Sequence, residues 1–249
     1  MFRCLFEYSK FGYKKIFKIF GIKISFSDRK RNLNKFIPLG CNCYARTIFT
    51  TGGVKPRKKY GELSLPFDLV AINEKNMSRI LSNKFNDFFN DLVYEPDNTF
   101  AKWSNKKYNL NFNHDNTIIT KEEFVERYQK RINNLFEILK SKKNYIIYTI
   151  KMFDEPVEAE VLNNIYCSLG EMSQKKKLKY FFFHLVKSID NNNILNKDVL
   201  NKNILYNEIK VSDKFLNDWH LVDNFNTDLT LKPFYKIYKI IQEKEEKSC

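Results

Sequence analysis

The chain has 249 residues, of which 43% are hydrophobic and 16% aromatic, and its formal net charge is +14. This apolar content argues against an intrinsically disordered protein, and the length is enough for one large or two small domains. No stretch approaches the roughly 20 apolar residues of a membrane-spanning helix. The basic balance favours anionic partners such as lipid headgroups, phosphorylated glycans or nucleotide-linked substrates. Nucleic acid is not an expected partner, since the basic residues are scattered and no recognised motif is present.

Residues 1–27 alternate aromatic and basic side chains, as in the run Ile16-Phe17-Lys18-Ile19-Phe20. On a helix this pattern gives an apolar stripe flanked by lysines, which is typical of a segment that lies on an anionic membrane surface. The alternative is an N-terminal helix packed on the following domain. Residues 27–34 are polar and charged and are expected to form a linker. We therefore expect a basic amphipathic segment with its linker over residues 1–34 and a single α/β domain of catalytic type over residues 35–249.

The organising element of the chain is the stretch Phe36–Ala45 (FIPLGCNCYA). It predicts a short buried strand, a turn containing Gly40, and a helix from about Asn42 to Thr50. The first N–H groups of such a helix point at one small volume, where the helix dipole favours an anion and lowers the pKa of a thiol. Many enzymes present a nucleophile in this way. The alternative is that Cys41 and Cys43 are small buried hydrophobic residues.

The cysteines form an odd and widely spaced set: Cys4, Cys41, Cys43, Cys167 and Cys249. This is not a disulfide framework, and it suits a reducing cytoplasm. Only one residue separates Cys41 from Cys43, whereas zinc hairpins have two to four, and no second pair follows. We therefore expect no metal and no cofactor. The expected location is cytoplasmic, with peripheral contact to the inner face of the membrane through residues 1–27.

The middle of the chain predicts further parts of a site. In Pro66-Phe67-Asp68, the carboxylate of Asp68 either caps the next element or faces a cleft. Asn73 to Asn83 predicts a helix, and the phenylalanines after it are expected to lie in the core. The irregular, asparagine-rich stretch from Tyr94 to Asn111 predicts a loop or lid that carries Trp103.

His114 is the histidine that the sequence favours for chemistry. It closes an alternating run with Leu110 and Phe112, so the three side chains are expected to share one face of a strand. A lone histidine beside apolar residues is usually structural, and His184 and His220 are interpreted in that way. His114 differs because Asp115 follows it and a candidate thiol precedes it in the chain.

The second half of the chain shows clear alternation of helix and strand patterns. In the first helix Thr120 can form a capping box with Glu123. The expected elements are a helix over Thr120–Leu139, a strand over Tyr145–Ile150, a helix over Val157–Leu169, a strand over Tyr180–Val186, a weaker strand over Ile204–Val211 and a terminal helix over Pro233–Glu246. This order predicts an α/β fold with a layered, mostly parallel sheet flanked by helices.

Several polar residues follow the predicted strands. Sites in parallel sheets form at the carboxyl ends of the strands. Cys43 follows one strand, His114 ends a second, and Asp154 and Glu155 follow a third. We therefore expect these residues to converge on one edge of the sheet as a catalytic centre.

Three motifs carry a resemblance to a known family: Leu39-Gly40-x-x-Cys43, Pro66-Phe67-Asp68 and Phe112-x-His114-Asp115. Together they resemble an uncharacterised bacterial family described as papain-like cysteine peptidases, over about residues 35–210. The family pattern is Leu-Gly-x-x-Cys-x-x-Ala, then Pro-Phe-Asp-Trp, then Phe-x-His. Here Ala45 comes two residues after Cys43, and Leu69 stands where the family has tryptophan. The resemblance implies Cys43 as nucleophile, His114 as its base, and a papain-like α+β fold as the alternative architecture.

The first functional hypothesis is a cysteine-dependent hydrolase or acyltransferase acting on an ester or amide. Cys43 attacks a carbonyl, His114 takes and returns the proton, and backbone N–H groups near residues 42–44 hold the oxyanion. The preferred group to orient the imidazole is Asp68, with Asp115 or Asp154 as alternatives. Gly40, Cys41 and Asn42 complete the turn that presents the nucleophile.

Two other hypotheses belong to different classes. The protein is either a transferase that modifies glycans or lipids without covalent catalysis, or a non-enzymatic binding module in which Cys43 and His114 merely pack. The basic N-terminal segment is similar to leaders on bacterial enzymes of surface-polysaccharide metabolism. The expected substrate is accordingly a small molecule, a glycan or a peptide.

Overall fold

The computed structural model describes most of the chain. The described residues are 6–11, 14–19, 22–27, 33–96, 101–112, 114–115, 120–141, 144–152, 157–173, 178–187, 200–219 and 228–246. Asp154, a predicted site residue, and His220, interpreted as structural, lie outside these ranges.

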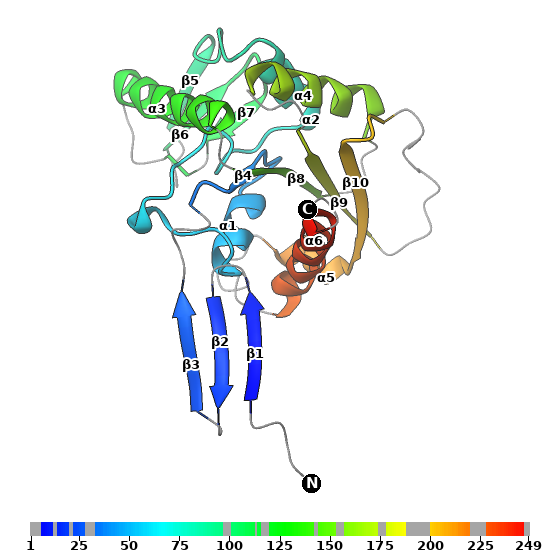
Figure 1. Ribbon diagram of the computed structural model, residues 1–249. Coiled ribbons are helices and arrows are strands. Elements are labelled where there is room, and N and C mark those ends of the chain that lie inside the picture. Colours follow the sequence, from blue (N-terminus) through cyan, green and yellow to red (C-terminus); the bar gives the residue numbers. More distant parts are fainter. Residues whose placement is uncertain are drawn as a thin grey trace.

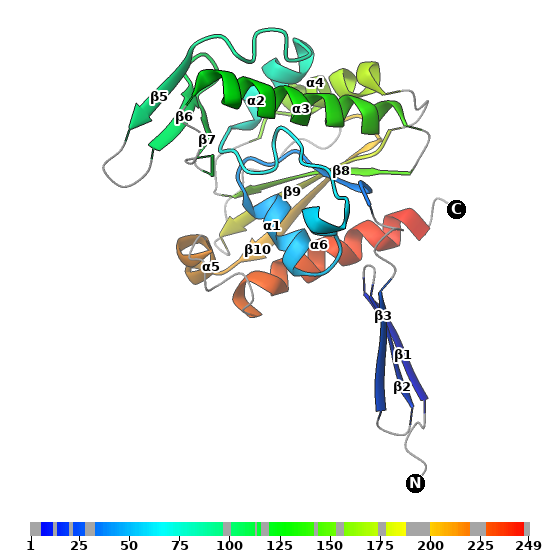
Figure 2. The same ribbon diagram turned by 90° about the vertical axis from the view of Figure 1, so that its left-hand side faces the viewer.

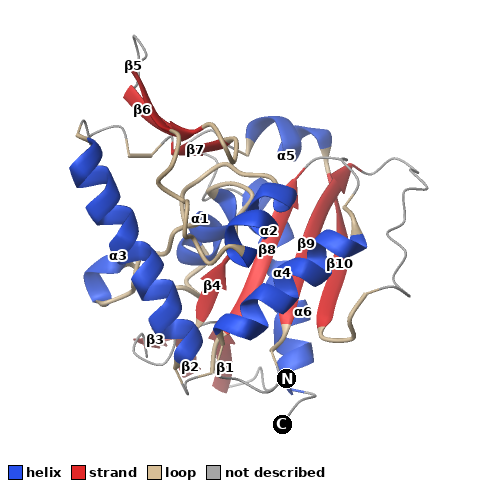
Figure 3. Ribbon diagram, turned by 90° about the horizontal axis from the view of Figure 1, so that it is seen from above, coloured by secondary structure: helices blue, strands red, loops and turns tan. Residues whose placement is uncertain are grey.

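The central element is a four-stranded parallel sheet in the order β10-β9-β8-β4. Its strands are β4 (Phe36–Pro38), β8 (Ile146–Met152), β9 (Tyr180–Lys187) and β10 (Ile204–Val211). Figure 3 shows the four strands side by side, with helices in front of and behind them. A mostly parallel sheet flanked by helices confirms the α/β fold class that the sequence predicts.

Helices cover both faces of this sheet. They are α1 (Tyr44–Thr51), α2 (Glu74–Ser82), α3 (Lys121–Lys140), α4 (Ala159–Met172), α5 (Asp213–Asp218) and α6 (Asp228–Glu246), and Lys58–Tyr60 adds one turn of 3₁₀ helix. Figure 2 shows α2, α3 and α4 on one side of the sheet and α1, α5 and α6 on the other. Each layer has its own hydrophobic core against the sheet.

Side-chain alternation along the strands decides which core each residue joins. In β8, Ile146, Tyr148 and Ile150 pack with α1 and α6, whereas Ile147 packs with α2, α3 and α4. Every residue of β8 is buried, which explains why the sequence shows a continuous apolar run there. Burial on both faces is what a strand inside a two-sided α/β layer requires.

The helix predictions of the second half are confirmed with shifted boundaries. The Thr120 side chain accepts a hydrogen bond from the Glu123 N–H, so it caps α3 as the motif predicts. The α6 helix begins at Asp228, before the expected start at Pro233. Proline suits the first turn of a helix best, so the sequence predicted a helix that starts at Pro233. In the structure Pro233 lies inside the helix.

The expected loop over residues 94–111 is wrong. This region forms a second, antiparallel sheet of β5 (Leu92–Pro96), β6 (Ala101–Asn105) and β7 (Leu110–Phe112). The β6–β7 turn ends at Asn109, which adopts a left-handed φ of 45° that asparagine tolerates well. Trp103 is therefore not on a lid but buried, stacked on Phe124 of α3 with ring centroids 5.0 Å apart.

The N-terminal segment is not helical, contrary to expectation. It forms an antiparallel three-stranded sheet of β1 (Phe6–Phe11), β2 (Lys14–Ile19) and β3 (Ile22–Ser27). Alternation of aromatic or branched residues with lysine suits the two-residue period of a strand at least as well as a helix. Figures 1 and 2 show this sheet extending away from the parallel sheet. Contact of this segment with an anionic membrane stays a prediction.

Among the described residues, no helix is long and apolar enough to cross a membrane.

Candidate functional site

The turn from β4 into α1, residues 39–43, carries the predicted nucleophile; we call it the cysteine turn. Leu39 N–H donates to the carbonyl of Tyr148 on β8, which holds the turn at the carboxyl end of β4 (2.7 Å). Cys43 occupies the N-cap position of α1, and both Cys41 and Cys43 are half-buried. The structure thus confirms the predicted strand, turn and helix in this order.

Gly40 permits the close packing of this turn. A Cβ atom at Gly40 would lie 2.5 Å from the carbonyl oxygen of Asn42 and 3.3 Å from that of Phe67. Backbone atoms cannot move aside as a flexible side chain can, so any larger residue displaces the turn. Gly40 therefore serves the turn by its small size.

Asn42 satisfies part of the helix start. Its side-chain Oδ1 accepts a hydrogen bond from Tyr44 N–H at 3.0 Å, whereas the Cys43 side chain caps no N–H group. The Asn42 amide thus does the capping that a serine or aspartate usually does at this position. The Cys43 sulfur is therefore not used to cap the helix.

The ionisation state of Cys43 differs from the expectation. Burial raises the pKa of the Cys43 thiol, and a backbone hydrogen bond at Cys43 offsets this only in part. The helix dipole favours an anion at this position, but desolvation of the sulfur is the larger effect here. The neutral thiol is accordingly the stable form, and a nucleophilic Cys43 needs a base to remove its proton.

His114 is not part of a strand. β7 ends at Phe112, and His114 lies exposed in the turn that follows, while Leu110 and Phe112 are buried. The prediction that the three side chains share one strand face is therefore wrong, because the chain leaves the strand before it reaches the histidine.

Backbone hydrogen bonds nevertheless bring the His114 turn towards the cysteine turn. Ala71 and Asn111 exchange two bonds of 3.0 and 3.1 Å, and Ile72 N–H donates to the carbonyl of Cys41 at 3.1 Å. The segment of Ala71 and Ile72 thus lies between the cysteine turn and the end of β7. With backbones hydrogen-bonded about 4.8 Å apart, Cys41 and Asn111 are on the order of 10 Å from each other across this segment.

Asp115 is bound by residues of α3. Its two carboxylate oxygens accept hydrogen bonds from Arg127, Tyr128 and both terminal nitrogens of Arg131 on α3, at 2.6 to 3.2 Å. Burial alone would raise the pKa of Asp115, but the Arg131 charge and these bonds outweigh it and hold that pKa below its usual range. Asp115 therefore anchors the turn of His114 to α3.

Asp68 lies beside Arg46 of α1. Its Oδ2 accepts a hydrogen bond from Leu65 N–H at 3.0 Å and lies 3.4 Å from Arg46 Nε. Both side chains are buried, and among the described residues Asp68 Oδ1 and Arg46 Nη1 have no hydrogen-bond partner. The Asp68 carboxylate thus closes its own turn and also pairs with Arg46 in the first turn of α1. This pair helps to hold the start of α1, where the cysteine turn ends. The assignment of Asp68 as orienting residue stays a prediction.

The structure also reveals polar contacts that the sequence did not predict. On the sheet face covered by α2 and α4, Lys151 donates to Glu74 at 2.7 Å, and His184 Nδ1 lies 2.9 Å from the Tyr206 hydroxyl. A lysine at the end of an apolar strand and a histidine within a run of phenylalanines were the signals that could have marked them. Lys151 was overlooked and His184 was interpreted as structural, because their partners come from segments distant in the sequence.

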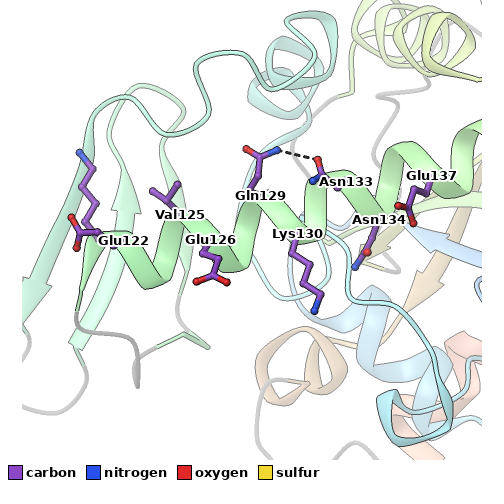
Figure 4. A pocket seen from close by; sticks show the side chains of 9 residues that line it. Glu122, Val125, Glu126, Gln129, Lys130, Asn133, Asn134 and Glu137 are labelled. Carbon is purple, nitrogen blue, oxygen red and sulfur yellow. Dashed lines mark hydrogen bonds between the residues drawn. The ribbon is translucent and has the colours of Figure 1, made fainter.

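A hollow that is lined by α3 does not include any residue of the cysteine turn. Figure 4 shows its lining by side chains of that helix: Lys121, Glu122, Val125, Glu126, Gln129, Lys130, Asn133, Asn134 and Glu137. None of these lining residues is a cysteine or histidine, and they are mostly exposed and polar. This hollow contributes nothing to the chemistry of the cysteine turn.

In the described part of the chain, no group of three or more histidine, cysteine, aspartate or glutamate residues is arranged to hold a metal ion. The chain was compared with protein-family models, curated proteins and solved structures, and none of them matches it. The assignment to the papain-like family accordingly stays a prediction from the sequence motifs.

Proposed function

We propose that the protein is a cysteine-dependent hydrolase or acyltransferase whose nucleophile is Cys43. The observation that carries this proposal is the place of Cys43: half-buried, at the start of α1, directly after a strand of a parallel sheet. This is the edge at which parallel sheets bind ligands. The N–H groups at the start of α1 point towards the same edge and favour developing negative charge.

The raised pKa of Cys43 determines the form of the mechanism. Because the resting sulfur is a thiol, its proton must leave as the S–C bond forms. In the proposed step, the sulfur attacks a carbonyl carbon, His114 takes the proton, and the same proton goes to the departing alcohol or amine. The product is an acyl thioester on Cys43.

Cations near the cysteine turn favour a substrate with negative charge. Burial lowers the pKa of Lys58, and the charges of Arg131 and Arg46 lower it further, while Asp68 and Asp115 act in the opposite direction. With Arg127, which also binds Asp115, four cations share two carboxylates in one neighbourhood, which leaves a net positive potential. A phosphorylated glycan or an acidic peptide fits this potential, in line with a role in surface-polysaccharide metabolism.

The test is acylation by p-nitrophenyl acetate, followed by intact-mass and peptide mass spectrometry. We expect a burst of p-nitrophenol with one acetyl group on Cys43, and its loss in Cys43→Ser. The matched control Cys41→Ser, two residues earlier in the same turn, should retain the burst. His114→Ala should slow acylation by about 10²–10⁴-fold, as for other general bases. Equal acetylation of Cys41, Cys43 and the exposed Cys167 would contradict the proposal.

A further inference from the structure

The sheet of β1, β2 and β3 has two unlike faces. In an antiparallel sheet, successive residues of a strand lie on opposite faces, and register partners share a face. One face, which we call the apolar face, consists of three rows: Phe6 with Ile19 and Ile22, Tyr8 with Phe17 and Ile24, and Lys10 with Lys15 and Phe26. The rows of the other face are Glu7 with Lys18 and Lys23, Ser9 with Ile16 and Ser25, and Phe11 with Lys14 and Ser27. The register thus collects most apolar residues of the segment on one face.

The α/β layers do not cover this sheet. Among the described helices and strands, no other element packs closely against β1, β2 or β3. Figures 1 and 2 show the sheet projecting away from the α/β layers. A single sheet becomes stable when its hydrophobic face is covered. The apolar face therefore needs a partner that the described part of the chain does not supply.

The apolar face is not uniform along the strands. Figure 1 shows β3 running towards the α/β layers, so the rows at its start lie farther from these layers than the row at its end. The two outer rows are entirely apolar, whereas the inner row contains Lys10 and Lys15. This arrangement suits a segment that enters the boundary between headgroups and acyl chains and keeps its lysines at the level of the headgroups.

The charge of the sheet favours an anionic partner. Its strands contain five lysines and one glutamate. Two register pairs join lysine to lysine: Lys10 with Lys15, and Lys18 with Lys23. Like charges directly opposite each other destabilise a sheet. An anionic lipid surface offsets this repulsion, and the net charge of +14 of the whole chain acts in the same direction.

The same features disfavour a second copy of the chain as the partner. Packing two apolar faces together would bring Lys10 and Lys15 of both copies into one interface, and this face contains no acidic residue. A face of three six-residue strands measures only about 15 Å by 20 Å. This footprint is well short of the area of about 800 Å² per partner that a stable dimer buries.

We propose that the apolar face of β1, β2 and β3 docks the protein on the surface of an anionic lipid bilayer. The outer rows enter the boundary between headgroups and acyl chains, and Lys10 and Lys15 bind lipid phosphate groups. The sheet stays at this depth, because the N–H and C=O groups of the edge strands β1 and β3 would lose their hydrogen-bond partners inside the hydrocarbon layer. This docking goes beyond the reaction proposed for Cys43 and does not depend on it.

The test is sedimentation of the full chain with vesicles of phosphatidylcholine, with and without phosphatidylglycerol. We expect binding only to the vesicles that contain phosphatidylglycerol, and weaker binding at high salt. Lys10→Gln combined with Lys15→Gln should weaken binding by about 25-fold, because each lysine near an anionic surface contributes about 5-fold. Equal binding to both kinds of vesicle, or no binding to either, overturns the inference.

Two isoleucines of β2 provide a matched pair of variants. Ile19 lies on the apolar face and Ile16 on the opposite face. Ile19→Ser should weaken vesicle binding by about 10-fold, since an apolar residue leaves the lipid boundary, whereas Ile16→Ser should leave binding unchanged. Residues three apart share one side of a helix but lie on opposite faces of a strand. An equal loss in both variants therefore contradicts docking through the apolar face.

Tryptophan fluorescence answers the same question if a serine variant fails to fold, which circular dichroism shows. Anionic vesicles should shift the emission of Tyr8→Trp to the blue and leave that of Ser9→Trp unchanged; the reverse overturns the inference.

Light scattering without lipid separates the two candidate partners, and we expect a monomer. A dimer that Ile19→Ser disrupts, together with no vesicle binding by the wild type, overturns the inference in favour of a second copy. The burst of p-nitrophenol from Cys43 is measured without lipid and should be the same in Ile19→Ser. Loss of vesicle binding with an intact burst therefore leaves the proposed function standing, and binding without a burst leaves the docking standing.

Discussion

The two faces of the parallel sheet differ in chemistry although they share the same strands. Along β8 and β9, the face towards α1 and α6 is apolar throughout and ends with Met152 and Leu185. The opposite face is apolar at the amino ends, with Ile147 and Tyr180, and turns polar towards the carboxyl ends, where Lys151 and His184 lie. One face is thus apolar throughout, whereas the other also carries the buried ionisable groups Lys151 and His184, with the exposed Glu208 beside them on β10.

The cost of such a polar row explains why only one face carries it. A buried charge without a partner destabilises a protein strongly, and even a paired one contributes little net stability. Here every member has a partner: Lys151 pairs with Glu74, and His184 and Glu208 share Tyr206. Substitutions on the two faces should expose the difference in how each face contributes to stability.

The largest effect is expected on the apolar face. Phe183→Ala deletes a fully buried ring between β9 and α6, so it should lower the free energy of unfolding by about 4 kcal/mol. Phe183→Leu, which retains most of the volume, should cost only about 1 kcal/mol. Urea unfolding followed by circular dichroism measures both. Equal costs for the two variants would show that packing on this face is loose.

A smaller but still large effect is expected from the ion pair on the opposite face. Lys151→Met leaves Glu74 buried without its cation, which should lower the free energy of unfolding by about 3 kcal/mol. Adding Glu74→Gln removes the unpaired charge and should restore about 1 kcal/mol or more. If the single variant were as stable as the wild type, Glu74 would have to be solvated and the contrast between the faces would fail.

The smallest of these effects concerns Asp115, which ties the turn of His114 to α3 on the polar side of the molecule. Asp115→Asn removes a charge that accepts several hydrogen bonds, so it should cost about 2 kcal/mol at pH 7. The folded-state pKa of Asp115 is lowered, so its contribution is complete above the unfolded pKa of about 3.9 and is lost as the pH falls further.

Urea unfolding of wild type and Asp115→Asn between pH 7 and pH 3 measures this. The difference between them should shrink below about pH 4, because protonation of the wild-type carboxyl mimics the variant. Asp213→Asn is the control, since its carboxylate is exposed and pairs with Lys187 at the surface; it should change stability by no more than about 0.5 kcal/mol. A constant difference across the pH range would mean that folding leaves the pKa of Asp115 unchanged, contrary to this prediction.

Much of the fold follows from local patterns in the sequence. The β10 strand occupies its predicted residues, Ile204–Val211, and the helix stripe of Phe124, Tyr128 and Ile132 is buried as expected. Two segments were misjudged, residues 6–27 as a helix and residues 94–109 as a loop, and both contribute strands to antiparallel sheets. Short antiparallel strands give weak signals, because their alternation extends over few residues and can also fit a helix stripe or a loop.

The candidate site was only partly predictable, for a related reason. The cysteine turn is contiguous in sequence, so Gly40, Asn42 and Cys43 could be assigned to it directly. Asp68 and Asp115 were predicted as residues that orient an imidazole, and the sequence did not predict that they pair with arginines on α1 and α3. Buried carboxylates pair with the nearest cation, and which cation is nearest depends on how the helices dock.

The sequence by itself determined the α/β class, the helices and strands of the second half, and the position of Cys43 at a strand-to-helix turn. These features depend on residues close together in the chain, where hydrophobic period and capping act directly. Tertiary structure alone decided that Lys151, His184, Tyr206 and Glu208 lie together on one face. Strand register joins residues that are distant in sequence, and no local pattern records which residues will be neighbours across a sheet.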